Sequence, residues 1–370
     1  MKSVCLDARK IEDGGIGTYI QNILKNLEPA HFELTLILPP YLIEKRPDLK
    51  KFQVIPCQSP PYSIQEQLQL PRLIPPCNLF WSPHFNVPLL PIRARKRLVT
   101  IHDVFHLAYF SQLKFLEKCY AKMMISRAIR LSHQIVTVSR FTEDELIRLT
   151  SVKKEKIAVI PIGVDQKLFT PCFNEKKCDE IRKKYSLPNR YFLFIGNQKA
   201  HKNFKGTVKS FSQFLLNTGA DAYLILAGSG AGLRYVDDVA AVLKKFPQLE
   251  KRVVPLGFVA EKDLPFLYQF AVSLVFPSFY EGFGLPPLEA MSCHCPAIVS
   301  KVASLEEVCG DAVYYVDPYD CRTLAKGMEL LWKDQIFRDS LIEKGKVHVK
   351  KFVWKDVAQK HLEFIHKVIL

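Results

Sequence analysis

Two glutamates, Glu281 and Glu289, lie in the segment FPSFYEGFGLPPLEAMSCHCPAIVS, residues 276–300, with a glycine-rich turn and two prolines between them. The prolines suit the first turn of a helix that begins near Leu285, because an N–H group in that turn has no helical partner to lose. The backbone N–H groups from Gly282 to Leu285 then lie at a helix N-terminus, which favours a bound anion. The segment therefore predicts a diphosphate site.

The two carboxylates indicate what surrounds such a diphosphate. Side chains of a helix lean toward its N-terminus, so Glu289 points back to the anion site, while Glu281 approaches it from the loop. Since phosphate repels a carboxylate, both are expected to accept hydrogen bonds from hydroxyl groups slightly farther away. Hydroxyls on both sides of a diphosphate describe a nucleotide sugar. The alternative is that Glu289 only favours the helix dipole and Glu281 only caps a turn.

A second glycine-rich stretch, with Gly14, Gly15 and Gly17, lies between the first expected strand, Ser3 to Ala8, and the first expected helix, Gly17 to Leu27. Small residues there let the backbone approach a phosphate or a sugar. The pattern is not GxGxxG, and no acidic residue stands where the ribose of a nicotinamide cofactor requires one. A dehydrogenase is therefore disfavoured.

Polar residues also follow two other apolar runs of the first half. His102 and Asp103 end a strand expected at Leu98 to Asp103, and Ser139 and Arg140 end another. Ligands of open α/β sheets bind at the carboxyl ends of the strands. A single histidine in this position is either held by backbone groups or faces a ligand, and both alternatives stay open for His102.

No metal site is predicted. Cys293 and Cys295 are closer together than the cysteines of a CxxC motif, and no second pair with histidine accompanies them. Asp237 and Asp238 lie in a helical pattern, whereas a metal-binding DxD pair belongs at a strand end.

The composition describes a globular protein that favours anionic partners. The 370 residues are 48% hydrophobic and 24% charged, and Asp7 interrupts the N-terminal apolar run before it reaches the length of a signal peptide. We therefore expect a cytosolic protein whose ten cysteines are reduced. Residues 1–185 contain 29 Lys and Arg against 18 Asp and Glu, so most of the net charge of +15 belongs to the first half. Such a field suits phosphorylated substrates, an anionic membrane surface or nucleic acid.

Apolar runs alternate with helical patterns along the whole chain, which predicts an α/β protein with two doubly wound parallel sheets in series. We expect an N-terminal domain at residues 1–170, a C-terminal domain at 171–350, and a final helix at 351–370 that can pack back on the N-terminal domain. Ligands are then expected in a cleft where the carboxyl ends of the two sheets face each other.

Several motifs together resemble the retaining glycosyltransferase family 4, also described as group 1 glycosyl transferases, which has the GT-B fold of two Rossmann-like domains. EGFGLPPLEAM followed by PAIVS is similar to the family's glutamate-x7-glutamate signature. The other matches occur in the family's order along the chain and are DARKIEDGGIGTYIQNIL, TIHDVFHL, IVTVSRFTEDEL, VIPIGVD, FIGNQKAHKNF, LAGSG and LGFVAEKDL.

The resemblance implies roles for single residues. Glu289 binds the donor ribose, Glu281 binds hydroxyls of the donor sugar, and Lys202 neutralises the leaving diphosphate, where negative charge grows as the glycosidic bond breaks. The implied catalytic residues are His102, Glu281 and Lys202. The implied donor-binding residues are Gly15, Gly17, Asn197, Lys202, Val259, Glu281, Gly282, Phe283, Gly284, Leu285 and Glu289. The implied residues on the acceptor side are Asp103, Ser139 and Arg140. Many relatives carry an arginine near the position of Asn197, so a second cation is in question here.

The resemblance further implies transfer of a hexose, with mannose as a guess, from GDP-mannose or a UDP-hexose to a saccharide or lipid-linked acceptor, with retention and without a metal or cofactor. The motifs look most like those of bacterial surface-polysaccharide mannosyltransferases. The basic helical pattern LKFLEKCYAKMMISRAIRL is either an ordinary solvated face or a contact with anionic lipid at the inner face of the membrane. The alternatives are a GT-B nucleotide-sugar epimerase and a basic nucleic-acid-binding protein.

Overall fold

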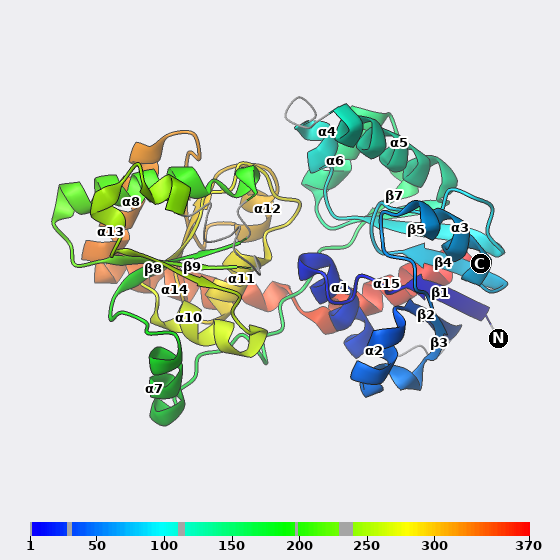
Figure 1. The fold of residues 1–370 in the computed structure, drawn as a ribbon, viewed down its shortest axis with the longest axis horizontal. Helices are drawn as coiled ribbons and strands as arrows, with labels where there is room; N and C mark the ends of the chain where they lie inside the picture. The colour runs from blue at the N-terminus through cyan, green and yellow to red at the C-terminus, as the bar shows by residue number, and fades with distance from the viewer. Residues whose placement is uncertain (1, 28–31, 110–114, 197–198, 229–239) are drawn as a thin grey trace. The chain divides into compact units, whose positions relative to one another are not determined.

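The computed structural model describes residues 2–27, 32–109, 115–196, 199–228 and 240–370 (Figure 1). Its internal contacts divide the chain into two compact units. The N-terminal unit comprises Met1–Gly163 and Trp354–Leu370, and the C-terminal unit comprises Val164–Val353. The sequence predicted divisions after residues 170 and 350. None of the helices in the described residues is long and apolar enough to cross a membrane.

The N-terminal unit contains a seven-stranded parallel sheet in the order β3-β2-β1-β4-β5-β6-β7. Its strands are β1 (Lys2–Asp7), β2 (Phe32–Leu38), β3 (Gln53–Pro56), β4 (Cys77–Ser82), β5 (Ala94–Ile101), β6 (Gln134–Thr137) and β7 (Ile157–Val159). Its helices are α1 (Gly14–Asn26), α2 (Pro40–Lys45), α3 (Ile64–Leu73), α4 (Phe105–Ala108), α5 (Phe115–Leu131), α6 (Arg140–Thr150) and α15 (Trp354–Ile369).

The C-terminal unit contains a six-stranded parallel sheet in the order β10-β9-β8-β11-β12-β13. Its strands are β8 (Tyr191–Ile195), β9 (Tyr223–Ala227), β10 (Val253–Gly257), β11 (Ser273–Phe276), β12 (Ala297–Ser300) and β13 (Tyr314–Val316). Its helices are α7 (Glu175–Lys184), α8 (Phe204–Thr218), α10 (Leu264–Phe270), α11 (Leu285–Ser292), α12 (Leu305–Cys309), α13 (Cys321–Lys333) and α14 (Gln335–His348).

Both sheets confirm the predicted α/β class. Each has the 3-2-1-4-5-6 strand order of the Rossmann fold, extended by β7 in the N-terminal unit. The order reverses between β1 and β4 in one sheet and between β8 and β11 in the other. Ligands of such sheets bind beside the carboxyl ends of the strands at this reversal.

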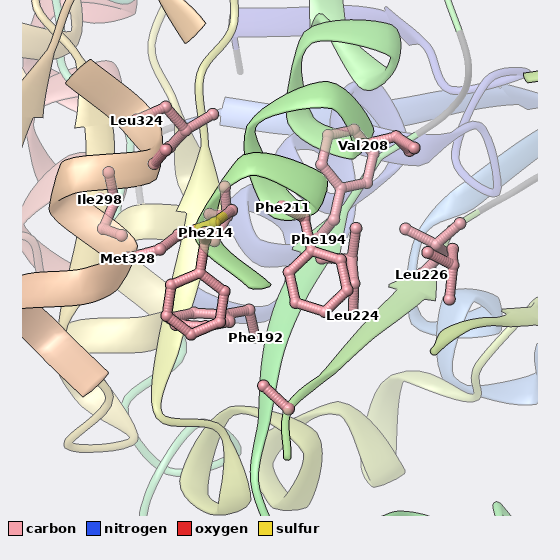
Figure 2. Close-up of a cluster of buried hydrophobic side chains, with 14 of the residues drawn as sticks. Phe192, Phe194, Val208, Phe211, Phe214, Leu224, Leu226, Ile298, Leu324 and Met328 are labelled. Atoms are coloured by element: carbon pink, nitrogen blue, oxygen red, sulfur yellow. The ribbon is translucent and has the colours of Figure 1, made fainter. Parts of the chain in front are cut away.

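Aromatic packing holds the C-terminal unit together (Figure 2). Phe192 of β8 meets Phe211 and Phe214 of α8, with ring centroids 6.4 and 5.3 Å apart. Leu324 and Met328 of α13 pack into the same cluster, so α8 and α13 share one face of the sheet. Burying each such side chain stabilises the fold by about 1.5–3 kcal/mol, which gives the strand ends of this sheet a rigid support.

Two expectations about local structure are wrong near the first glycines and near His102. Helix α1 begins at Gly14 instead of Gly17, and the N–H group of Gly17 donates to the carbonyl of Asp13 at 2.9 Å, so the glycines form a first helical turn and not a loop. Strand β5 ends at Ile101, because the Asp103 carboxylate accepts the N–H of Phe105 at 2.9 Å and starts α4.

Candidate functional site

An ion pair between Lys202 and Glu281 is the centre of the candidate site in the C-terminal unit. Lys202 ends a short 3-10 helix that follows β8, and Glu281 lies in the loop between β11 and α11. Because β8 and β11 are neighbours in the sheet, residues 79 positions apart meet, with Nζ 2.7 Å from Oε1. The side chains are only 16% and 12% exposed. The Lys202 ammonium also lies 5.2 Å from the centre of the Phe276 ring.

Glu289 lies on α11, which begins at Leu285 as predicted, and is fixed by a tyrosine of the preceding helix. The hydroxyl of Tyr268, on α10, donates to Oε2 of Glu289 at 2.6 Å. Burial, with a smaller contribution from the charge of Glu261, raises the pKa of Glu289 to about 7, although the Tyr268 hydrogen bond opposes the shift. Glu289 therefore lies near its titration midpoint at neutral pH.

Contacts with Leu305 and Ser304 fix the conformation of the loop that leads into α11. Gly284 has φ +101°, and a Cβ atom there would lie 2.5 Å from the Leu305 side chain, so glycine is required on both counts. The buried hydroxyl of Ser304 lies 2.9 Å from the carbonyl oxygen of Glu281 and 3.0 Å from that of Phe283. These contacts direct the carbonyl groups toward Ser304. In the first turn of α11 the N–H groups come from Leu285 and Leu288, because the two residues between them are prolines and have none.

Three glycines bring the ends of β8, β9 and β10 close together. Gly196 donates its N–H to Ala227, and Gly228 donates to Gly257, both at 3.0 Å. A Cβ atom at Gly228 would lie 2.0 Å from the carbonyl oxygen of Gly196. Val259, two residues beyond β10, is buried.

In the N-terminal unit, His102 follows β5 and is held by its neighbours. Its Nε2 lies 2.9 Å from the carbonyl oxygen of Pro83, which only accepts, so Nε2 carries the proton and Nδ1 is the acceptor of the neutral ring. The Tyr19 ring meets it edge-on, with centroids 4.9 Å apart. Burial lowers the pKa of His102, although the Pro83 hydrogen bond and the charge of Asp103 oppose this shift. The lowered pKa keeps the ring neutral at physiological pH.

Of the remaining expected residues of this unit, Ser139 and Gly17 have local structural functions. Ser139 caps α6 by accepting the N–H of Thr142 at 3.1 Å, and Arg140 is exposed in the first turn of that helix. A Cβ atom at Gly17 would lie 2.6 Å from the carbonyl oxygen of Ile11, so close packing of its own chain requires this glycine. Gly15 is exposed and has no atom within 4 Å of a Cβ position.

The structure thus brings Lys202, Glu281 and the start of α11 together in one unit, with Glu289 farther along the same helix. Asn197, Asp237 and Asp238 lie outside the described residues. Sequence reasoning missed Tyr268 and Ser304, because each acts through a hydrogen bond to a distant element and neither belongs to a motif.

Comparison with known proteins identifies the family of both units. Residues 178–348 match the model of glycosyl transferases group 1, and residues 13–168 match that of glycosyltransferase family 4. The O-antigen chain mannosyltransferase B of Escherichia coli is 31% identical over 282 residues, which cover 75% of this chain and 71% of the relative. The O-antigen chain mannosyltransferase RfbU of Salmonella typhimurium is 30% identical over 245 residues, which cover 65% of this chain and 61% of the relative.

Solved structures share the fold at lower sequence identity. The sucrose-phosphate synthase of Thermosynechococcus elongatus has a TM-score of 0.79 at 19% identity and covers 100% of this chain and 99% of its own. Anabaena HepE in complex with UDP-glucose has a TM-score of 0.78 at 17% identity and covers 99% and 100%. The two matched models, the E. coli relative and the two Rossmann-like sheets agree, and the chain belongs to the group 1 and family 4 glycosyltransferases of the GT-B fold.

Proposed function

We propose that the chain transfers a hexose, with mannose as the first candidate, from a nucleotide diphosphate sugar to a saccharide or lipid-linked acceptor of a cell-surface glycan, with retention of the anomeric configuration. The observation that carries this proposal is the Lys202–Glu281 ion pair beside the N-terminus of α11. It combines a fixed cation, a carboxylate and backbone N–H groups at one strand end.

The ion pair suggests how the site changes when the donor binds. A diphosphate beside α11 attracts the Lys202 ammonium away from Glu281, and the released carboxylate then accepts hydrogen bonds from the hydroxyls of the sugar. As the glycosidic bond breaks, negative charge moves onto the diphosphate, where Lys202 and the helix N-terminus stabilise it. Glu289 accepts hydrogen bonds from the ribose. The proposal needs no metal, since the lysine supplies the positive charge.

The relatives support the choice of donor. Two of them are O-antigen chain mannosyltransferases, which makes GDP-mannose the first donor to test, and HepE forms complexes with UDP and UDP-glucose. UDP-hexoses are the second choice.

The decisive experiment measures donor binding and transfer separately. GDP-mannose and UDP-glucose are titrated against the wild type, and transfer to a mannose oligosaccharide is assayed with and without EDTA. Lys202→Ala should lower kcat by about 100-fold to 1,000-fold, because the developing charge loses its cation. Unchanged kcat would refute the role of Lys202, and loss of transfer in EDTA would refute metal independence. Retention is read from the anomeric signals of the product.

A matched control guards against a general charge effect. Lys205 is exposed on the first turn of α8, three residues from Lys202. Lys205→Ala removes the same charge from the same region and should leave kcat close to that of the wild type. A similar loss in both variants would place the effect in the field of the whole unit instead of at the ion pair.

We also propose peripheral contact with anionic lipid at the cytoplasmic face of the membrane, supported by the net charge of +15 and its concentration in residues 1–185. Co-sedimentation with vesicles that contain phosphatidylglycerol should fall steeply as salt rises, because the attraction is screened. Equal binding to neutral vesicles would contradict this proposal.

A further inference from the structure

A buried network of charges lies at the carboxyl ends of β1 and β4. Arg9 donates to both oxygens of Asp7, at 2.8 and 2.7 Å, and to Glu66 at 2.5 Å. All three side chains are about 1% exposed or less. Burial alone would raise the pKa of Asp7, but the charge and hydrogen bonds of Arg9 lower it below its usual value. Such a network is costly to bury, so its arrangement calls for an explanation beyond stability.

The network positions the segment that carries Tyr62. Glu66 accepts the backbone N–H of Tyr62 and the side-chain amide of Asn86 through the same oxygen, both at 2.7 Å. Tyr62 has φ +66°, a left-handed conformation that is uncommon for a large side chain. Residues held in this way are found preferentially at functional sites. The network therefore fixes an unfavourable backbone in order to present one tyrosine ring.

The Tyr62 ring belongs to an aromatic surface that is open to solvent. Tyr62 is 46% exposed and Tyr120 is 36% exposed, with ring centroids 6.4 Å apart. Tyr120 donates its hydroxyl to Asn86 at 2.8 Å. The ammonium of Lys10 lies 4.6 Å from the centre of the Tyr62 ring. Exposed tyrosine rings with polar neighbours suit a partner that is apolar on one face and rich in hydroxyls at its edges, as a pyranose is.

His84 supplies a hydrogen-bond donor beside this surface. Its Nδ1 accepts the N–H of Asn86 at 3.2 Å, so the neutral ring carries its proton on Nε2. Burial lowers the pKa of His84 to about 3, and the ring is therefore neutral at physiological pH. Nε2 is buried and has no hydrogen-bond partner among the described residues. Its ring centroid is 5.9 Å from that of Tyr62.

We propose that Tyr62, Tyr120 and His84 form the subsite for a pyranose ring of the acceptor saccharide, with the Tyr62 ring against the sugar face, the Tyr120 ring, inclined at 69° to it, against the sugar edge, and the Nε2–H of His84 donating to one of the sugar oxygens. This subsite rests on the proposed transferase function and adds the residues that recognise the acceptor. Because Nε2 is buried, this contact requires the Tyr62 side chain to change rotamer when the sugar binds. The link to His102 supports the assignment, since Pro83, the residue before His84, accepts the hydrogen bond of His102 at 2.9 Å.

Two substitutions of His84 separate ligand recognition from structural support. An asparagine reproduces the position of Nδ1, so His84→Asn keeps the acceptor for Asn86 and loses the Nε2 donor. A glutamine reproduces the position of Nε2, so His84→Gln keeps the donor. Methyl α-mannopyranoside and methyl α-glucopyranoside are titrated against the full chain by saturation-transfer NMR. We expect His84→Asn to weaken binding of the preferred glycoside about tenfold and His84→Gln to retain most of it.

The tyrosine is tested in the same way. Tyr62→Ala should weaken glycoside binding about tenfold and Tyr62→Phe, which keeps the ring, only slightly. Near-ultraviolet circular dichroism of each variant reports whether the fold is retained. The inference is overturned if neither glycoside binds the wild type, or if His84→Asn and Tyr62→Ala bind as the wild type does. It is also overturned if His84→Gln loses as much as His84→Asn, which would indicate a structural role.

Titration of GDP and UDP against the same variants keeps this test apart from that of the proposed function. Nucleotide binding is expected to be unchanged in all four variants. Absence of nucleotide binding in the wild type, with glycoside binding that still depends on His84, would refute the transferase while leaving a sugar site. Normal nucleotide binding with unaffected glycoside binding would refute the subsite alone.

Discussion

At the scale of single residues, the hydrogen bond from Tyr268 to Glu289 controls the charge of a carboxyl group in the candidate donor site. Burial raises the pKa of Glu289 to about 7, and the Tyr268 hydroxyl, 2.6 Å from Oε2, is the contact that opposes this shift. Only the ionised carboxylate accepts hydrogen bonds from two ribose hydroxyls through both oxygens. The affinity for the donor should therefore depend on pH within the physiological range.

We expect donor affinity to fall as the pH drops through about 7, because protonation of Glu289 removes its charge. Tyr268→Phe removes the bond that favours the carboxylate and should move the midpoint of this fall to higher pH. Calorimetric titration of GDP-mannose between pH 5.5 and pH 8.5 measures the profile. In Glu289→Gln the profile should be flat over the same range.

Tyr315→Phe is the matched control, since it removes a half-buried tyrosine hydroxyl of the same unit that donates to Gly310 at 2.7 Å and does not contact Glu289. Its profile should coincide with that of the wild type. A Tyr268→Phe profile with an unshifted midpoint would show that another group is responsible for the pH dependence.

The sequence predicted the donor-site residues by type and order, but not the residues that hold them. Lys202 and Glu281 each follow a recognisable strand, and neighbouring strands place their ends together. Tyr268 lies in the apolar run LPFLYQF, where it resembles an ordinary core residue. His84 accepts the backbone N–H of Asn86, whereas Glu66, from a different element, accepts its side-chain amide, and such a tertiary contact leaves no local pattern in one sequence.

At the scale of secondary structure elements, helix α15 completes the N-terminal unit by closing a buried polar chain. Nδ1 of His361 donates to its own helix at Val357, 2.8 Å away, so Nε2 accepts the hydroxyl of Tyr19 on α1 at 2.6 Å. Tyr19 also lies 3.2 Å from Thr100 of β5, which accepts the indole N–H of Trp81 at 2.9 Å. These hydrogen-bonded side chains connect two helices and two strands without exposing a polar atom.

This series of hydrogen-bonded side chains makes the stability of the unit depend on pH. Burial lowers the pKa of His361 to about 4, against an unfolded value near 6.5. Between these values the unfolded state binds more protons, so stability rises with pH in this window and is lost as the pH falls through it. We expect His361 to contribute a loss of up to about 3 kcal/mol between pH 7 and pH 4. Urea unfolding of the wild type and His361→Gln at several pH values measures it.

The glutamine keeps an acceptor for Tyr19 but does not titrate, so its stability should change less with pH than that of the wild type. His84 titrates in the same sense and contributes equally to both proteins. His366→Gln, at an exposed position of α15, serves as the control and should follow the wild type. Parallel curves for the wild type and His361→Gln would contradict the role of this imidazole.

The succession of elements was predictable because buried parallel strands are short apolar runs with helices between them. The boundaries of single elements were less predictable, because they depend on contacts with other elements. Strand β5 begins within the basic run RARKR, which has no strand pattern, because its backbone pairs with β4 from Ala94 onward. The Arg97 side chain donates to the carbonyls of Pro88 and Leu90 at 2.8 and 3.0 Å. The return of α15 also depends on Gly163, since a Cβ atom there would lie 2.7 Å from the N atom of Trp354.

At the scale of the whole molecule, the two units differ in how the chain builds them. The C-terminal unit is one continuous segment, Val164–Val353, whereas the N-terminal unit needs Trp354–Leu370 in addition to the first 163 residues. The aromatic cluster around Phe211 and the ion pair of Lys202 and Glu281 lie entirely within the continuous segment. Length and alternating pattern predicted two domains, but no local signal in the final helix showed which unit it joins.

The continuous segment should therefore fold and bind nucleotide by itself. A fragment of residues 164–353 is expected to unfold cooperatively in urea and to bind GDP or UDP within about tenfold of the affinity of the full chain, since the nucleotide contacts proposed for Lys202 and Glu289 are all inside it. Residues 1–163 alone should be much less stable than a version in which residues 354–370 are joined to them, because Tyr19 and Trp81 lose the cover of His361. A fragment 164–353 that folds but binds neither nucleotide would place an essential donor contact in the N-terminal unit. Equal stability of the N-terminal fragment with and without α15 would mean that the polar chain from Trp81 to His361 adds nothing to its fold.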